Sequence, residues 1–221
     1  MYTVTEVYNN VPSDPALRTA KGFSCYIEEA ALLFDTGGDP AVLSANLRAL
    51  GIEPAGIRML VLSHDHWDHV GGLQAVLGRN PDLAVYILDT FSEETKSAVA
   101  AGGRTEIVDG WRELAPGLFS TGPCGDNPAE QALALRTERG YLIITGCAHP
   151  HISAIIRTVE RHGPVMGAVG GFHSVSEEDI ESLKKLVYLS PSHCTEGIET
   201  IREKNTGAFK QGGAGRQHRF S

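Results

Sequence analysis

Residues 63–72 concentrate side chains that bind metals. The stretch reads Ser-His-Asp-His-Trp-Asp-His-Val-Gly-Gly and directly follows the apolar run at 59–62. Neutral imidazole and carboxylate oxygen are ligands for zinc, iron and manganese. A strand that ends in so many histidines and aspartates is poor material for packing. The pattern therefore predicts a metal site at the end of a buried strand.

The spacing inside this stretch favours two adjacent ions over one. In an extended segment, His64 and His66 point to the same side of the chain and could share one metal. Asp68 and His69 follow where the chain turns into a helix, so they address a neighbouring position. Paired metals about 3.5–4 Å apart can hold a bridging hydroxide and stabilise the attacking and leaving oxygens.

Hydrophobic periodicity predicts a mixed α/β protein. The tail that contains Gly207 and Gly215 is expected to be loop or a last edge strand. No internal repeat, low-complexity block or linker is visible, so residues 1–221 are expected to form a single domain. We predict strands at 3–8, 23–27, 31–34, 58–62, 83–88, 106–108, 118–120, 131–137, 141–145, 165–169 and 186–189, and helices at 41–50, 70–77, 93–101, 152–162, 177–185 and 195–204.

Loops that bear histidine follow the predicted strands at four places, after residues 62, 145, 169 and 189. Strands of one sheet that end in the same direction would bring such loops together at one edge. The recurrence therefore predicts that histidines far apart in the chain contribute to one region.

Composition restricts the possible partners. The 221 residues carry a formal net charge of −8, and 42% of them are hydrophobic. This balance argues against sequence-independent binding of nucleic acid, which needs clustered cationic side chains.

The four cysteines form no CxxC pair, the N-terminus lacks the features of a signal peptide, and no run reaches the roughly 20 apolar residues of a membrane span. We expect a soluble, cytoplasmic protein with no membrane partner, and leave its oligomeric state open.

The segment His64-x-His66-x-Asp68-His69 resembles the signature of the metallo-β-lactamase superfamily. Asp35, in Phe-Asp-Thr-Gly, matches the upstream aspartate that usually supports the metal loop in that superfamily. The resemblance implies a four-layer αββα sandwich with the metal site at one edge between the sheets.

Three further segments resemble a subgroup that includes the dihydropterin ribofuranosylaminobenzene phosphate synthases. They are Thr-Gly-Cys-Ala-His-Pro at 145–150, Gly-Gly-Phe-His at 170–173 and Ser-His-Cys-Thr at 192–195. The likeness extends from about Gly22 to Thr195.

The remaining ligand of the first metal is not in its usual place. No histidine lies between His69 and His149, so His149 is our preferred substitute, with Asp126 or Glu130 as carboxylate alternatives. Cys147 stands where many relatives place a bridging aspartate; its thiolate would favour zinc, but a buried cysteine can also merely pack.

The later histidines receive different assignments. His193 matches the position of the superfamily's last metal ligand. His173 matches no general ligand and is assigned as a substrate contact or proton donor, with a structural role as the alternative. His151, His162 and His218 are expected to be solvated.

The resemblance implies a metal-dependent hydrolase with a dinuclear site. Two divalent ions, zinc in preference to manganese or iron, would carry a hydroxide that attacks a phosphoester or an ester or lactone centre of a small, anionic molecule. Asp68 would orient that hydroxide, and His173 would stabilise the oxyanion or protonate the leaving group. Iron-based redox members typically have Glu at the position of His66, so hydrolysis is favoured over redox chemistry.

Two alternatives stay open. One is a pterin-phosphate condensing transferase that releases diphosphate. The other is a catalytically idle metal-binding module that recognises a small ligand or a protein.

Overall fold

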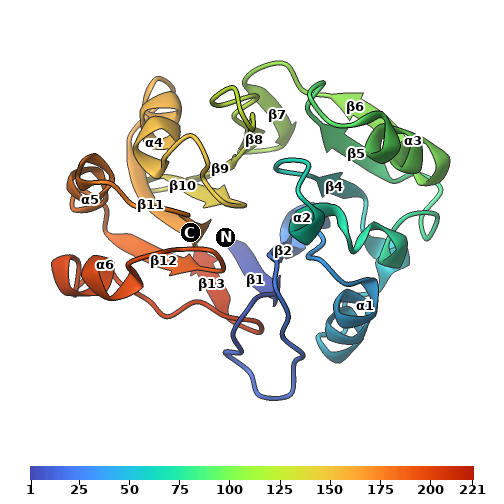
Figure 1. The fold of residues 1–221 in the computed structure, drawn as a ribbon, viewed down its shortest axis with the longest axis horizontal. Helices are drawn as coiled ribbons and strands as arrows, with labels where there is room; N and C mark the ends of the chain where they lie inside the picture. The colour runs from blue at the N-terminus through green and yellow to red at the C-terminus, as the bar shows by residue number, and fades with distance from the viewer. The chain divides into compact units, whose positions relative to one another are not determined.

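The computed structural model describes residues 1–221 and divides them into two compact units. The first comprises 1–108 and 213–220, and the second comprises 109–212 with Ser221. Each unit contains one β-sheet and three α-helices (Figure 1). The expectation of a single domain over 1–221 stays a prediction.

The sheet of the first unit has seven strands in the order β13-β1-β2-β3-β4-β5-β6. The pairs from β3 to β6 are parallel, whereas β13, β1, β2 and β3 pair antiparallel. The strand bounds are β1 (Tyr2–Tyr8), β2 (Ser24–Ile27), β3 (Leu32–Phe34), β4 (Met59–Val61), β5 (Ala84–Ile87), β6 (Arg104–Ile107) and β13 (Gln217–Phe220). Parallel strands buried on both faces need continuous apolar runs, and β4 and β5 supply them.

Helices connect the parallel strands of this sheet. Asp39 caps the first helix, because its side chain accepts hydrogen bonds from the backbone N–H groups of Ala41 and Val42. Ser92 caps the third helix in the same way, through Thr95. The helices are α1 (Pro40–Ala49), α2 (Trp67–Val70) and α3 (Glu93–Gly102), with short 3-10 turns η1 (Glu28–Ala30), η2 (Pro54–Gly56) and η3 (Leu73–Ala75).

The predicted helix at 70–77 is wrong. Helix α2 begins at Trp67, inside the histidine-rich stretch, and ends at Val70. The chain then passes against the backbone of residues 36–38, where the Gly72 N–H donates to the Gly37 carbonyl oxygen. A Cβ at Gly72 would lie 2.1 Å from the carbonyl oxygen of Thr36, so only glycine allows this approach. The tertiary contact ends the helix after one turn.

The sheet of the second unit has six strands in the order β12-β11-β10-β9-β8-β7. Strands β10, β11 and β12 pair parallel, and the remaining pairs are antiparallel. The bounds are β7 (Arg112–Ala115), β8 (Leu118–Ser120), β9 (Leu133–Thr137), β10 (Gly140–Thr145), β11 (Val165–Gly171) and β12 (Tyr188–Ser192). Strand β7 is absent from the prediction, because this half-exposed edge strand carries no clear apolar alternation.

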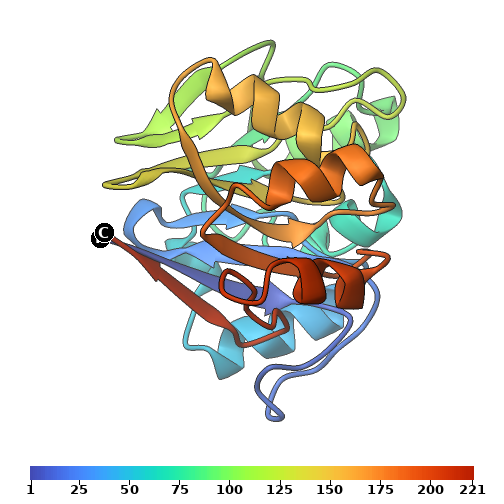
Figure 2. The same ribbon diagram turned by 90° about the vertical axis from the view of Figure 1, so that its left-hand side faces the viewer.

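Three helices, α4 (Ile152–Glu160), α5 (Glu177–Leu183) and α6 (Ile198–Lys204), cover one face of this sheet (Figure 2). Helix α4 directs Ile152, Ile155, Ile156 and Val159 into the core, the spacing of an amphipathic helix. Helix α5 begins with a cap at Ser176, which forms a reciprocal capping box with Asp179.

The histidine-bearing loops divide between the two sheets. The loops after β10, β11 and β12 leave adjacent parallel strands at one edge of the six-stranded sheet, as expected for strands that end in the same direction. The loop after residue 62 leaves β4 in the seven-stranded sheet. In each unit, therefore, the chemistry-bearing residues lie at the carboxyl ends of parallel strands, where ligand sites of α/β sheets are usually found.

Of the two expectations for the tail, loop or edge strand, the structure shows the edge strand. Strand β13 pairs with β1, and its alternation directs His218 and Phe220 inward. The expectation that His218 is solvated is wrong: it is buried, and its Nε2 lies 3.0 Å from Oε1 of Glu6.

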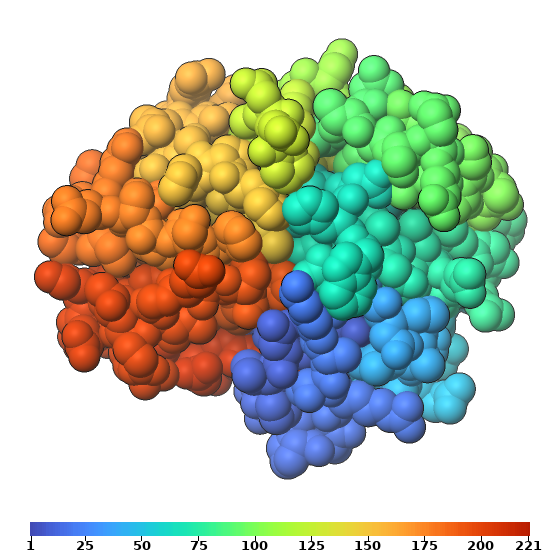
Figure 3. All heavy atoms as spheres, in the orientation of Figure 1, coloured from blue at the N-terminus to red at the C-terminus, as the bar shows by residue number.

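Figures 1 and 3 show the long loop at 9–23 in blue at the lower edge of the view. None of the helices has the length and apolar character that a membrane span requires.

Candidate metal centre

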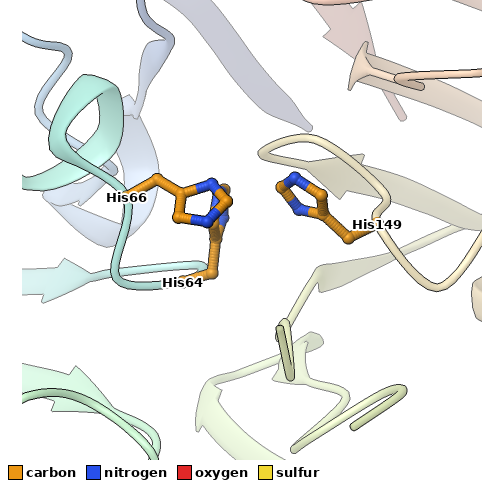
Figure 4. A group of neighbouring side chains, drawn as sticks. All are labelled: His64, His66 and His149. Carbon is orange, nitrogen blue, oxygen red and sulfur yellow. The ribbon is translucent and has the colours of Figure 1, made fainter. Parts of the chain in front are cut away.

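The donors of the first unit lie at the end of β4 and on α2. His64 and His69 are buried, and the centres of their rings are 4.2 Å apart. Nε2 of His64 lies 3.1 Å from Nδ1 of His66, and Figure 4 shows these two rings side by side. The ligand atoms of Asp68 and His69 lie within 4.8 Å of each other. The structure thus gathers the predicted donors of this stretch at one strand end.

A buried aspartate at the end of β3 holds this stretch in place. Asp35 accepts hydrogen bonds from the backbone N–H and the hydroxyl of Ser63, each at 2.7 Å. Its Oδ2 also lies 2.7 Å from Nδ1 of His69. Asp35 has a φ of 55°, in the left-handed region, which turns the chain out of the strand. Asp35 therefore supports the loop, the role that the resemblance implies for it.

The same carboxylate also orients His64 through Ser63. The Ser63 hydroxyl donates to Asp35, so it is an acceptor towards Nδ1 of His64, 2.8 Å away. A proton on Nδ1 leaves Nε2 of His64 as the atom with a lone pair. Asp35 likewise accepts the Nδ1 proton of His69. Both imidazoles are thereby held in the tautomer that ligates through Nε2.

Asp65 has an anchoring role. Its carboxylate accepts hydrogen bonds from the Ser92 N–H and the Thr95 hydroxyl at the start of α3, each at 2.7 Å. Burial alone would raise the pKa of Asp65, but these hydrogen bonds outweigh burial and lower the pKa. Beside this anchor lies a surface pocket of about 550 Å³, lined by residues of 65–77 and 92–98 that include the exposed Trp67.

The donors of the second unit begin on the loop after β10, and a buried glutamate organises them. Glu130 accepts hydrogen bonds from the backbone N–H groups of Cys147, Ala148 and His149, at 2.9–3.1 Å. Its Oε2 also lies 3.0 Å from Nδ1 of His149, the ring that Figure 4 shows extending from this loop. Both carboxylate oxygens of the buried Glu130 thus hold the loop in place, which gives Glu130 a positioning role, and the ligand role considered for it stays a prediction. Asp126 lies exposed in the preceding loop.

Cys147 meets the chain after β12. Sγ of Cys194 lies 3.3 Å from Sγ of Cys147, and neither cysteine is in a disulfide. The ligand atoms of Cys147, His193 and Cys194 all lie within 4.8 Å of one another. Hydrogen bonding with the Cys147 side chain, and then with His193, lowers the pKa of the Cys194 thiol far below its usual value, against the opposing effect of burial.

His173 lies at the end of β11 and is exposed. Its ring centre is 4.9 Å from that of His149. It has a φ of 44°, and its carbonyl oxygen accepts a hydrogen bond from the N–H of Glu196. His173 therefore lies near one predicted ligand of the second unit and is open to solvent.

Two other histidines are exposed to solvent, as expected, and each also contacts a neighbouring side chain. Nδ1 of the half-exposed His151 lies 2.8 Å from Oδ2 of Asp179. The exposed His162 stacks on Trp111, with ring centres 3.8 Å apart. Neither is among the donor groups described above.

The donor chemistry fits divalent transition metals. In each unit, a carboxylate contacts Nδ1 of a histidine and leaves Nε2 of that ring available to a metal. The donor groups also contain a carboxylate or a thiolate. Sequence reasoning missed Cys194 as a member of the second set. Its signal was present in the segment Ser-His-Cys-Thr, which was matched as a motif without a role for the cysteine.

Known proteins resemble this chain over most of its length. Residues 24–192 match the sequence model of the metallo-beta-lactamase superfamily. The 7,8-dihydropterin-6-methyl-4-(beta-D-ribofuranosyl)-aminobenzene-5'-phosphate synthase of Methanocaldococcus jannaschii is 25% identical, and the alignment covers 88% of this chain and 87% of that protein.

Solved structures show the same fold. Tm1679, a metal-dependent hydrolase of the beta-lactamase superfamily, matches with a TM-score of 0.84 and 23% identity over 100% of both chains. A diphosphatase from the PhnP family matches with a TM-score of 0.67 and 14% identity, over 100% of this chain and 98% of that one. These matches confirm the expected α/β fold class of the metallo-β-lactamase type.

Proposed function

This chain belongs to the metallo-β-lactamase superfamily, and from that premise we propose that it is a metal-dependent hydrolase acting on a small anionic molecule. It uses two divalent ions, with zinc as the favoured metal. Bound ions of this kind supply Lewis acidity, which polarises the scissile group and lowers the pKa of an attacking water. The proposed ligands are His64, His66, Asp68, His69, Cys147, His149 and His193.

One observation supports this proposal most strongly: each unit pairs a buried carboxylate with Nδ1 of a histidine. The pairs are Asp35 with His69 and Glu130 with His149. A carboxylate on Nδ1 raises the basicity of the ring and directs Nε2 outward, the arrangement found around metal-ligating histidines. Buried carboxylates also pair with His151 and His218, but only His69 and His149 belong to groups of residues that could hold a metal.

Two residues are proposed to act on the substrate. Asp68 orients the attacking water through its carboxylate, which lies beside His69. His173 is exposed and can donate a proton from its imidazole to the leaving group. Lys21, whose Nζ lies 4.0 Å from Oδ2 of Asp68, adds a cation that favours an anionic substrate.

The test combines metal reconstitution with a substrate panel. Metal-free protein receives zinc or manganese and is assayed on phosphodiesters, phosphomonoesters and lactones. We expect hydrolysis of at least one class, reduced by about a hundredfold or more in His64→Ala and retained in the control His162→Ala. A chain that binds metal but hydrolyses none of these classes contradicts the hydrolase proposal.

A condensing activity is the second candidate, and the similarity to the Methanocaldococcus jannaschii synthase over 88% of this chain favours it. In such a reaction the metals would activate a diphosphate leaving group. Release of diphosphate from a pterin diphosphate by the metal-loaded chain, without turnover of the ester panel, would support this candidate over hydrolysis. Absence of both activities in a metal-loaded chain would support the idle metal-binding module.

A further inference from the structure

The second unit contains two thiols that face each other across the sheet edge. Cys147 follows β10 and Cys194 follows β12, 47 residues later, and their Sγ atoms lie 3.3 Å apart. The superfamily resemblance gave Cys147 a possible ligand role and gave Cys194 none. The approach of the two thiols is therefore a property of this chain that the proposed function does not yet use.

The backbone is shaped to bring Cys194 to this place. Successive residues of a strand point to opposite sides, so His193 and Cys194 would normally diverge. His193 has a φ of 53°, in the left-handed region, and this turn lets both side chains reach the ligand atom of Cys147 within 4.8 Å. The Thr195 hydroxyl fixes the turn, because it donates to the Ser192 carbonyl oxygen and accepts from the Phe172 N–H.

The strand between the two cysteines leaves room for them. A Cβ at Gly171 would lie 2.8 Å from Sγ of Cys194 and 2.3 Å from the Gly146 carbonyl oxygen. A side chain at this position would therefore push the loops after β10 and β12 apart. Glycine here is what allows the two thiols to meet.

We propose that Cys147, Cys194 and His193 form a thiolate-rich subsite in which Cys194 is an additional metal ligand. Two thiolates that bind one zinc at about 2.3 Å in tetrahedral geometry lie about 3.8 Å apart. The observed 3.3 Å requires only a small opening to reach that value. Binding releases the thiol protons and forms two metal–sulfur bonds, with no change of oxidation state.

The thiolate ligands of this subsite determine which metal it binds. Thiolates favour zinc over manganese and magnesium, which prefer oxygen ligands. The inference rests on the proposed metal-dependent function and narrows it, because it makes zinc the ion of the second unit.

The experiment measures thiolate ligation directly. The full chain is loaded with Co²⁺ in place of zinc without oxygen, and the thiolate-to-cobalt charge-transfer absorption is recorded. In Cys194→Ala, the absorption is expected to fall to about half of that in the unchanged chain, because one of two thiolate ligands is lost. The control Cys124→Ala removes a buried cysteine of the same unit and is expected to leave the absorption unchanged.

A second measurement needs no variant. Alkylation of Cys194 by iodoacetamide is followed by peptide mass spectrometry, with and without added zinc. We expect zinc to protect Cys194 and magnesium to leave it reactive.

The two proposals fail in different ways. If the chain binds cobalt but Cys194→Ala keeps the full absorption and zinc leaves Cys194 reactive, the inference about Cys194 is wrong while metal-dependent function stands. If the protein contains a Cys147–Cys194 disulfide and binds cobalt without any thiolate absorption, the inference is overturned as well. If no metal binds at all, the proposed function itself is wrong.

Discussion

Oδ2 of Asp35 lies 2.7 Å from Nδ1 of His69, and both side chains are completely buried. The contact joins the end of β3 to helix α2, and it is repeated in the second unit by Glu130 and His149. In both places a buried negative charge is tolerated because backbone N–H groups and an imidazole share it. The arrangement fixes which nitrogen of each histidine carries the proton.

Replacement of Asp35 by asparagine tests the role of this charge. Asp35→Asn keeps the shape of the side chain but removes the anionic acceptor for His69 and Ser63. We expect metal affinity, measured by competition with a chelator of known affinity, to fall by about 10–100-fold. The control Asp39→Asn makes the same change at an exposed helix cap, where asparagine caps as well as aspartate. Equal affinities for the two variants would refute the orienting role of Asp35.

Glu130→Gln tests the loop after β10. Glutamine has one acceptor oxygen in place of two, so it cannot satisfy the three N–H groups of residues 147–149. We expect the free energy of unfolding of the metal-free chain to fall by about 1–3 kcal/mol, as measured by urea denaturation. Glu138→Gln, in the exposed turn before β10, should change it by less than about 0.5 kcal/mol. A loss as large at Glu138 as at Glu130 would show that the hydrogen bonds are not the cause.

Gly72→Ala tests the close approach behind the histidine-rich stretch. The new methyl group would meet the Thr36 carbonyl oxygen at 2.1 Å, so the backbone must move. We expect thermal denaturation to show a loss of about 1–3 kcal/mol. Gly56→Ala is the matched control, because a Cβ there meets nothing within 4 Å. A Gly72→Ala chain as stable as the Gly56→Ala chain would contradict the described packing.

The carboxyl group of Asp179 makes the free energy of unfolding depend on pH. Burial alone would raise its pKa, but hydrogen bonds from the Ser153 N–H, from Ser176 and from His151 outweigh burial and lower the pKa from 3.8 to about 2. A carboxyl with a depressed pKa in the folded state stabilises the protein above its unfolded pKa, and this stability is lost as the pH falls through the folded value. The difference corresponds to about 2 kcal/mol.

The measurement is the free energy of unfolding between pH 1.5 and 6 for the unchanged chain and Asp179→Asn. We expect the unchanged chain to be more stable at pH 6, with a difference that shrinks as the pH falls from about 4 to 2. Glu160→Gln, an exposed change at the end of α4, should follow the unchanged chain. A difference that stays constant across this range would contradict the depressed pKa.

Much of the fold is predictable because local patterns and tertiary structure agree. The apolar run before the histidines forms β4, and the turn at 138–139 joins β9 to β10. The predicted helix at 177–185 forms α5, which begins at Glu177. The end of α2 at Val70 was missed because the backbone of residues 36–38, distant in sequence, limits that helix to one turn.

The candidate site was predictable where residue types are adjacent in sequence or where histidines follow parallel strands. The metal-binding side chains at 63–69 can be recognised in the sequence itself. The approach of Cys147 to Cys194 depends on the register of β10, β11 and β12, which no local pattern encodes. The role of Glu130 depends on three N–H groups that face it in the folded chain. Such groups have no sequence signature.

The most direct test of the account is the transition-metal content of the full chain, purified without added metal and measured by elemental analysis. We predict about two metal ions per chain, mostly zinc, with a lower content in His64→Ala and an unchanged content in His162→Ala. A chain that contains no transition metal, and takes up none from a zinc solution, would contradict the account.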